Sequence, residues 1–403
     1  MKIHSPSNWR VTFTVMFIAQ FLSGLAFSFV LPFFPFYFRD LGVGTERGVL
    51  LWVGWSSAAF GITMAISAPL WGLVSDRFGR KLMVIRSMLA GAVVLGLMGL
   101  VTNPWHLLFL RILQGSLTGT VTASVALVSS ITPKSHRGIS LGLMQTAALL
   151  GTSAGPFLGG ILSGLYGYRV PCGLAFIALF AGTILVIVGA TEKFIPPEDD
   201  HISGLKTIGG ILTLPGFKLI LILYFLMYAI NMMIAPILPL FIEKLLLPGS
   251  KANAVSLTGV FIGVTSLLAG LSAIVYGKLG DRLGYTRILV YALVLAGLTS
   301  IPQSFAHSTI ELFIERCLFG LAIGGLIPSV NVLVAHTVPH EKVGSAYGLT
   351  GSVTCLGIGL GPLIGSFIAS LAGLRVPFAV VGISAFIVAF AVSVNIKNNG
   401  GTI

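Results

Sequence analysis

Charged residues are scarce in this chain. Asp, Glu, Lys and Arg make up only 9% of its 403 residues, 55% are hydrophobic, and the mean hydropathy is +0.99. Soluble domains carry roughly 25% charged residues, so this composition leaves too little charge to cover a soluble surface. It excludes a soluble enzyme or binding domain and predicts an integral membrane protein.

Cysteine is nearly absent. The three cysteines, Cys172, Cys317 and Cys355, are each isolated in an apolar segment, without the spacing of a disulfide framework or a metal site. A membrane enzyme would also need His, Asp, Glu, Ser or Cys side chains converging at one depth, and no such grouping is apparent. We therefore predict no metal site, no cofactor and no catalytic residue.

Dense basic runs are absent as well. The formal net charge of +12 would by itself be compatible with nucleic-acid binding. The positive charges are instead spread over short segments between apolar runs, and their excess follows one side of a membrane. We therefore predict the lipid bilayer as the surrounding partner, and no nucleic acid.

Long apolar runs dominate what is present. They are about 20–28 residues long, enough to cross a hydrocarbon core of about 30 Å. A spanning segment must satisfy its own backbone hydrogen bonds, and the alternating segments of about 10 residues that a barrel needs are missing, so the runs predict helices. The sequence predicts twelve spans, at residues 11–38, 48–74, 82–101, 105–131, 138–165, 171–190, 217–242, 254–277, 287–306, 309–335, 344–371 and 376–395.

Lys and Arg are distributed unequally between the two sides of these spans. If the N-terminus is cytoplasmic, sixteen of the 24 lie in cytoplasmic segments and six in outer ones, while Arg111 and Arg316 fall within spans. Cytoplasmic loops are enriched in Lys and Arg. This bias predicts that both termini and the segment 191–216 are cytoplasmic.

The two halves of the chain repeat the same signals about 205 residues apart. We predict a six-helix bundle at 1–190, a cytoplasmic linker at 191–216 and a second six-helix bundle at 217–403. Parallel repeats of this kind form a transport site near the midplane, between the halves, with alternating access. The matched positions are Pro32 and Pro35 with Pro236 and Pro239; Arg111, Gly115 and Gly119 with Arg316, Gly320 and Gly324; and Gly155, Pro156 and Gly159 with Gly361, Pro362 and Gly365.

Three motifs stand out within this repeat. The turn at 72–81 reads Gly-Leu-Val-Ser-Asp-Arg-Phe-Gly-Arg-Lys and returns in altered form at 277–287; the fourth span has Arg111-x-x-Gln114-Gly115; and residues 151–160 read Gly-Thr-Ser-Ala-Gly-Pro-Phe-Leu-Gly-Gly. Together they resemble the major facilitator superfamily over essentially the whole chain. Within it the chain resembles the twelve-span drug:proton antiporters, and most closely the MdtG-type bacterial multidrug resistance transporters.

The resemblance implies an all-α membrane protein of two six-helix bundles in a bacterial inner membrane. It implies a monomeric secondary transporter that exports structurally varied lipophilic drugs in exchange for protons, with the proton gradient as driving force. The stretch at 151–160 is similar to a helix 5 motif that is linked to exporters rather than symporters. An exporter of one specific solute, such as a sugar or siderophore, is the alternative that the sequence leaves open.

The turn at 72–81 is the expected cytoplasmic gate. Gly79 allows a tight reversal, and the neighbouring charges anchor the cytoplasmic face, as a purely topological role would also require. The resemblance implies that Asp76 lies near residues 344–345 in the outward-facing state, where a helix N-terminus stabilises a carboxylate by roughly 0.3–1 kcal/mol. The expected gate residues are Gly72, Asp76, Arg77, Gly79, Arg80, Asp281 and Arg282.

A stripe of small residues in the fifth span recurs in the eleventh. Small residues let membrane helices approach closely, and a proline removes a backbone donor and bends its helix. We expect these stripes to form the contacts of helix 5 with helix 8 and of helix 2 with helix 11, at which the helices slide past each other or seal the transport path. Static packing of the helices would give the same pattern. The motif residues are Gly151, Gly155, Pro156, Gly159, Gly361 and Pro362.

Three charged residues within spans are the candidates for proton coupling. A charge at the centre of a span costs about 2.5–3.5 kcal/mol on insertion scales. Of the twelve acidic residues, Glu315 lies clearly inside a span, so we expect it to carry the proton while Arg111 or Arg316 tunes its charge. The alternative is that the arginines brace backbone carbonyls and that Glu315 forms a local ion pair.

Uncharged polar side chains are the candidates for the substrate cavity. Methionines and aromatic residues in the seventh span would suit varied apolar ligands, although core or lipid-facing packing would also explain them. Many drug antiporters are expected to carry an acid in helix 1 or 4, or near the middle of helix 7 or 10. Helix 1 here has Gln20 instead and helix 7 has Asn231, which weakens the case for strong recognition of cationic drugs. The expected cavity residues are Gln20, Gln114, Gln145, Tyr228, Asn231 and Asn331.

Overall fold

The computed structural model describes residues 7–192, 194, 214, 216–246, 253–339 and 343–398, and all regular structure in these residues is helical. Twelve stretches among them are long and apolar enough to cross a membrane. The predicted twelve-span, all-α fold is therefore confirmed, with span boundaries within a few residues of those expected. Most of the segment 191–216 lies outside the described residues, so the division of the chain at that segment stays a prediction.

Several spans consist of two helices in succession. The helices are α1 (Ser7–Ser28), η1 (Leu31–Phe33), α2 (Phe34–Asp40), α3 (Glu46–Phe78), α4 (Arg80–Met98), α5 (Pro104–Leu117), α6 (Thr120–Ile131), α7 (Arg137–Tyr166), α8 (Arg169–Gly189), α10 (Phe217–Met233), α11 (Leu238–Leu245), α12 (Ala254–Leu283), α13 (Tyr285–Gln303), α14 (Thr309–Ile323), α15 (Leu326–Thr337), α16 (Val343–Ala372) and α17 (Val376–Asn398).

The first, fourth, seventh and tenth spans differ from the unbroken helices that the sequence predicts. Pro32 and Pro236 lie in the breaks that separate α1 from α2 and α10 from α11, where a missing N–H cannot continue the helix. Gly119 separates α5 from α6 with a φ of 143°, a conformation that other residues rarely adopt. The breaks recur at equivalent spans of the two halves, which extends the sequence repeat to the backbone.

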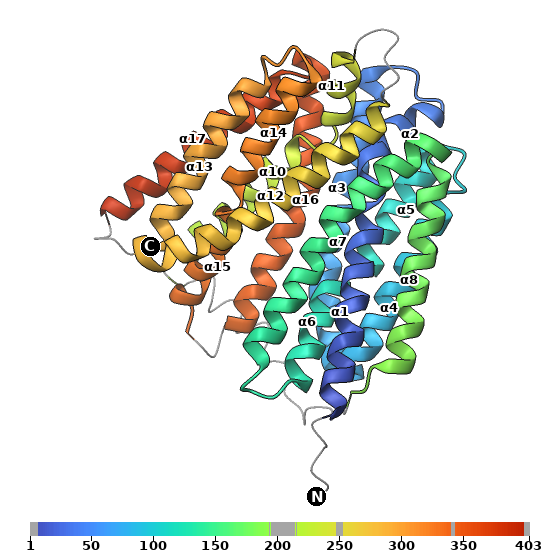
Figure 1. Ribbon diagram of the computed structural model, residues 1–403, viewed down its shortest axis with the longest axis vertical. Coiled ribbons are helices and arrows are strands. Elements are labelled where there is room, and N and C mark those ends of the chain that lie inside the picture. The colour runs from blue at the N-terminus through green and yellow to red at the C-terminus, as the bar shows by residue number, and fades with distance from the viewer. Residues whose placement is uncertain are drawn as a thin grey trace, which may run out of the picture.

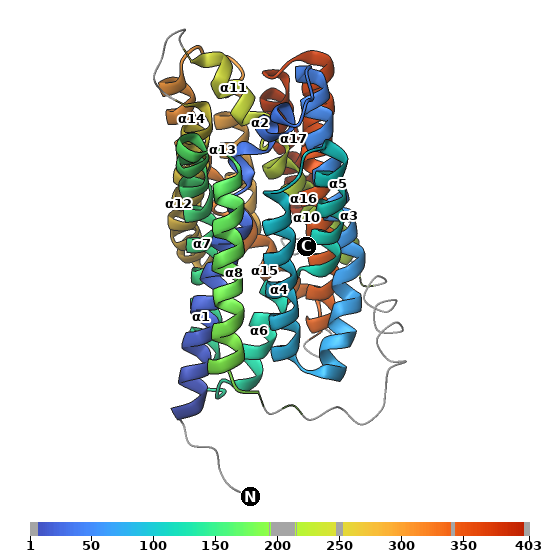
Figure 2. The same cartoon turned by 90° about the vertical axis from the view of Figure 1, so that its right-hand side faces the viewer.

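The helices run between two faces of the molecule (Figures 1 and 2). We call the face at which α1 begins the N-terminal face, and the other the opposite face. Four helices that start at the opposite face have a side chain that accepts a hydrogen bond from a free N–H in the first turn, as N-caps do. These caps are Thr45, Asn103, Asn253 and Ser308.

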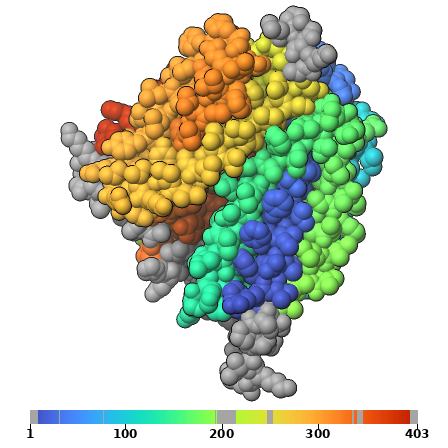
Figure 3. Space-filling view, in the orientation of Figure 1, coloured from blue at the N-terminus to red at the C-terminus, as the bar shows by residue number. Residues whose placement is uncertain are grey.

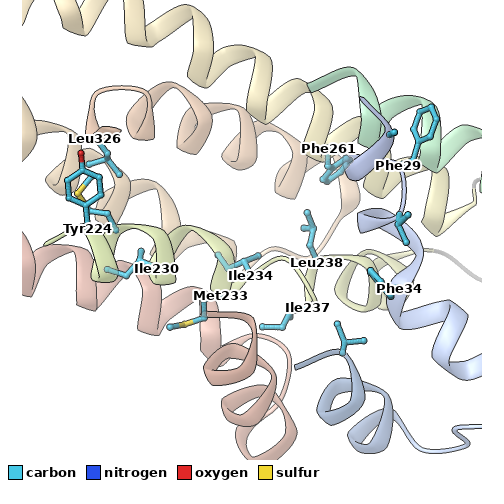
Figure 4. Packing of buried hydrophobic residues seen from close by; sticks show 14 of the residues in the cluster. Phe29, Phe34, Tyr224, Ile230, Met233, Ile234, Ile237, Leu238, Phe261 and Leu326 are labelled. Atoms are coloured by element: carbon cyan, nitrogen blue, oxygen red, sulfur yellow. The ribbon is translucent and has the colours of Figure 1, made fainter. Parts of the chain in front are cut away.

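Two helix pairs join the halves. α7 packs against α12, and α3 packs against α16, while each also packs within its own half, α7 on α1 and α16 on α10. Figure 1 shows the two groups of helices close together at the opposite face and leaning apart toward the N-terminal face. Close to the opposite face, buried Ile234, Ile237 and Leu238 gather between Phe261 and Phe34 (Figure 4), so the breaks in the first and seventh spans share one apolar core.

Replacing Gly159 by alanine is expected to destabilise the protein. A Cβ atom added there would lie 2.2 Å from the backbone oxygen of Phe29 in the break after α1, whereas one added at Gly142 in the same helix meets nothing within 4 Å. Overpacking of this kind costs about 1–3 kcal/mol. The midpoint of thermal unfolding in detergent should fall for Gly159→Ala and stay level or rise for Gly142→Ala. Equal midpoints for the two variants would contradict this packing.

Candidate functional site

The halves meet through two pairs of glycines, one toward the opposite face (Gly160 with Gly259) and one near the middle of the helices (Gly61 with Gly359). A Cβ atom added at Gly160 of α7 would lie 2.7 Å from the Cα atom of Gly259 in α12, and one added at Gly61 of α3 would lie 2.4 Å from the Cα atom of Gly359 in α16. Such separations leave no room for any side chain. Because lipid provides no hydrophobic force between helices, close backbone approach is what holds such pairs together.

The same four helices have parted at the N-terminal face. A Cβ atom added at Gly72 in α3, or at Gly348 or Gly351 in α16, meets no atom within 4 Å, and the same is true of Gly142 in α7 and Gly277 in α12. Figure 3 shows α7 and α12 diverging toward this face. The space between the halves is thus closed at the opposite face and open at the N-terminal face.

Two ion pairs cross between the halves at the opposite face. The guanidinium of Arg39 donates to both carboxylate oxygens of Glu243, at 2.8 and 3.0 Å, and the ammonium of Lys244 donates to Glu46 at 3.0 Å. Hydrogen bonding to Glu243 raises the pKa of Arg39. The side chains are about 40% exposed, apart from Lys244 at 56%, so each pair contributes little free energy by itself, about 0–1 kcal/mol. Together they connect the first half to the second half at this face.

Arg111 occupies an aromatic enclosure inside the first half. Its side chain is only 8% exposed, its guanidinium carbon lies 4.3 Å from the ring centre of Phe60 and 5.0 Å from that of Phe34, and it donates to Gln114 at 2.7 Å. Cation–π contacts of this kind contribute about 0.5–2 kcal/mol. Burial of Arg111 agrees with the stripe it shares with Gly115, whose face is closed by Phe60 and Thr63 of α3.

Arg316 and Glu315 lie side by side in α14 but do not pair. Arg316 is 8% exposed and lies 5.0 Å from the ring centre of Phe319, and its Nε and Nη1 atoms have no partner among the described residues. Glu315 is half-buried, with Oε2 likewise unpartnered. Consecutive helix residues point about 100° apart, so the structure does not bring the predicted coupling residues together in this conformation.

The glycine stripes face different partners from those expected. Gly151, Gly155 and Gly159 pack on α1, whose backbone lies within 2.2–2.6 Å of an added Cβ, and Gly361 and Gly365 pack in the same way on α10. The contacts between halves use Gly160, which points about 100° away from Gly159, and Gly359, which is two residues from Gly361 and so points about 160° away from it. Residues 151–159 thus hold α7 within its own half, and the expected seal with helix 8 comes from the adjacent face.

The predicted gate residues lie on exposed ends of α3 and α12. Gly79 ends α3 with a φ of 95° and begins α4, as expected for a tight reversal. Arg77, Asp281 and Arg282 are exposed, and the Tyr285 hydroxyl donates to Asp281 at 2.6 Å. The side chain of Asp76 and those of residues 344–345 lie outside the described residues, so their expected contact stays a prediction.

The predicted cavity residues are spread over several environments. Gln20 and Gln114 are buried, at 1% and 2% exposure, and therefore do not line open space in this conformation. Gln145 is exposed near the parted end of α7, and Asn231 is half-buried. In the second half Tyr224 donates to the side chain of Asn331, Tyr347 donates to the Asn331 backbone oxygen at 3.1 Å, and Tyr228 stacks on Tyr224.

Comparison with known proteins agrees with this architecture. The sequence matches the Major Facilitator Superfamily over residues 16–270 and 220–399, which together cover nearly the whole chain. The chain belongs to the major facilitator superfamily. It is 34% identical over 401 residues to the multidrug resistance protein MdtG of Enterobacter lignolyticus, covering 99% of this chain and 95% of the relative. The MdtG protein of Citrobacter koseri is 35% identical over 378 residues, covering 93% of this chain and 92% of that protein.

Two solved transporter structures have the same fold. The human organic anion transporter MFSD10 aligns with a TM-score of 0.71 at 19% identity, over 96% of this chain and all of that one. The nucleoside transporter NupG aligns with a TM-score of 0.76 at 14% identity, over 96% of this chain and 98% of that one. This superfamily protein is accordingly a multi-pass membrane protein, and its relatives are transporters.

The two ion pairs at the opposite face were not predicted from the sequence. The signal was available in the repeat, because the 204-residue offset of Pro35 and Pro239 places Arg39-Asp40 against Glu243-Lys244 with the order of charges reversed. Arg39 therefore pairs with its own repeat equivalent. Equivalent positions of the two halves meet near the axis that relates the halves. Two residues that meet there attract each other only if their charges are opposite.

Reversing one charge of this pair is expected to loosen the opposite face. With Cys172, Cys317 and Cys355 replaced by alanine, a Ser256→Cys residue at the contact of α12 with Gly160 reports on opening. Its reaction with an impermeant maleimide from the opposite face should rise severalfold in Glu243→Arg, because like charges then face each other. The swapped pair, Arg39→Glu with Glu243→Arg, should restore slow reaction. Equal rates in all three proteins would show that the ion pair does not hold this face.

Proposed function

We propose that this protein exports structurally varied lipophilic compounds from a bacterial cell by proton antiport. The observation that carries the proposal is the asymmetric contact between the halves, which are sealed at the opposite face and parted at the N-terminal face. Transport by alternating access requires a central space that opens to one face at a time. The similarity to multidrug resistance proteins over nearly the full chain supports drugs as the substrate and does not favour an exporter of one specific solute.

The proposed orientation puts the N-terminal face in the cytoplasm. The Lys and Arg bias of the loops supports this orientation, with both termini cytoplasmic and the protein in the inner membrane. The structure then corresponds to an inward-open conformation, ready to take substrate from the cytoplasm or the inner leaflet. The outward-open conformation would require the pairs of Arg39 with Glu243 and Lys244 with Glu46 to break.

Proton coupling is proposed to centre on Glu315. Its carboxylate is half-buried, with one oxygen unpartnered among the described residues, and the buried Arg316 follows it directly. A neutral carboxylic acid tolerates the apolar environment and an ionised one favours water or a cation, so gain and loss of a proton would favour different positions of α14. Arg111 is the equivalent cation in the first half, and the proton gradient is the driving force.

Small lipophilic substrates suit the character of the inner surfaces. Tyr228, which is half-buried, and Tyr347, which is exposed, offer aromatic faces and hydroxyl groups without fixed charge near Asn331, and such surfaces accept varied apolar ligands. We propose that the protein works as a monomer in the lipid bilayer, with drugs and protons as its ligands, no nucleic acid and no other cofactor.

Glu315→Gln is expected to abolish proton-driven efflux. Proteoliposomes with an imposed pH gradient and a lipophilic fluorescent cation would measure this, because the amide keeps the size of the side chain but cannot carry the proton. The matched control is Glu311→Gln, one turn earlier in α14, where the carboxylate accepts a hydrogen bond from the His307 backbone at 2.8 Å. Efflux should fall to background in the first variant, at least tenfold if the proton is essential, and persist in the second.

Two outcomes would count against the proposal. Equal pumping by wild type and Glu315→Gln would make Glu315 structural and would move the proton to another group. No response of the wild type to unrelated lipophilic compounds, combined with transport of one solute, would replace the multidrug proposal with a single-solute exporter.

A further inference from the structure

Glu192, just after α8, binds the beginning of a different helix. One carboxylate oxygen accepts the backbone N–H of Arg80 at 3.0 Å, and the other accepts that of Lys81 at 2.7 Å. These are the first two residues of α4, immediately after the reversal at Gly79. The first N–H groups of a helix have no partner within the helix, and a carboxylate there is favoured by the helix dipole.

A reciprocal contact joins the same two helices. The ammonium of Lys81 donates to the backbone oxygen of Ile187 in the last turn of α8, at 2.9 Å, where a cation is favoured. The Thr191 N–H donates to the Thr12 hydroxyl of α1 at 3.1 Å. We call Glu192, Lys81, Thr191 and Thr12 the clamp. It ties the turn at 79–81 to the ends of α8 and α1.

Gly79 is shaped to fit this clamp. A Cβ atom added at Gly79 would lie 3.1 Å from Glu192 Oε2 and 3.4 Å from Cγ of Phe194, and the φ of 95° already disfavours other residues. The glycine of the predicted gate thus serves two purposes, the reversal of the chain and the approach of the carboxylate.

The second half has no carboxylate for an equivalent clamp. The 206-residue offset places Asn398 at the position of Glu192, and the chain has no acidic residue after Glu341. At the matching turn, Tyr285 instead donates to Asp281 within the turn itself. The clamp therefore belongs to the half from which the segment 191–216 departs.

We propose that Glu192 is a positioning residue for closure of the N-terminal face, an inference that rests on the proposed alternating access. Gly72, Gly348 and Gly351 show empty space between the ends of α3 and α16, and closure must bring these ends together. The turn at 79–81 follows directly on α3. A turn that is already fixed loses less conformational entropy on docking than a free one, so the clamp favours the closed state.

Spin labels at Gly142→Cys and Gly277→Cys, both open positions on α7 and α12, would measure closure in the cysteine-replaced background. Glu192→Gln keeps the size of the side chain but removes its charge. A short distance between the labels marks closed molecules and a long distance marks open ones. The ratio of closed to open molecules should fall about fivefold or more, as expected if loss of the carboxylate disfavours the closed state by about 1–2 kcal/mol. In Glu192→Gln the maximal rate of drug transport should fall, and the KM for the drug should stay unchanged. Glu192→Asp, which keeps the charge, should recover part of both, and Glu311→Gln, which removes a carboxylate–backbone contact local to α14, should change neither.

The outcomes separate this inference from the proposed function. Distances and maximal rate equal to wild type in Glu192→Gln would overturn the inference, and so would a loss of thermal stability with both unchanged. If Glu192→Gln does not fold, equal distance ratios in Glu192→Asp and wild type would overturn it. The distance measurement needs no drug, so a wild type that closes but transports none of the compounds tested would refute the multidrug proposal alone.

Discussion

Close backbone approach between the halves is the constraint on which the rest of this structure depends. Gly160 against Gly259 and Gly61 against Gly359 leave no space for a side chain. In lipid, helices gain nothing from hiding apolar surface from one another, so such contacts must supply the association that the hydrophobic effect supplies in water. Gly160 with Gly259 lies toward the opposite face and Gly61 with Gly359 lies near the middle of the helices, whereas the ends of the same four helices are separated at the N-terminal face.

The polar contacts at the two faces differ in which elements they connect. At the opposite face, Arg39 with Glu243 and Lys244 with Glu46 connect one half to the other. At the N-terminal face, Glu192 and Lys81 tie elements of one half together, so they can persist through a change of conformation. Under the proposed alternating access, contacts of the first kind would break when the opposite face opens, and contacts of the second kind would keep the turn at 79–81 fixed in both states.

The sequence predicts the spans, the repeat and the fold because lipid allows few alternatives for a chain with so little charge. It does not predict which face of a glycine stripe meets which neighbour, because adjacent residues on a helix point about 100° apart. Gly159 and Gly160 are neighbours in the motif, yet one packs on α1 and the other on α12. The breaks beside Pro32 and Gly119 cannot be predicted either, because proline and glycine are tolerated in membrane helices. The contact of Glu192 is equally unpredictable, because its partner Lys81 is 111 residues away in the sequence.

The buried charges can be understood only across more than one conformation. Arg316 and Glu315 have unpartnered polar atoms within the described residues, and an unpaired charge in a span is costly. Arg39, by contrast, is paired with Glu243. In a transporter, a charged group can have different partners in different conformations. A buried charge without a partner in one conformation destabilises that conformation and so favours the change to the other. If the N-terminal face is cytoplasmic, as proposed, the incomplete pairing of Glu315 and Arg316 in this conformation fits the role in proton coupling that we propose for them.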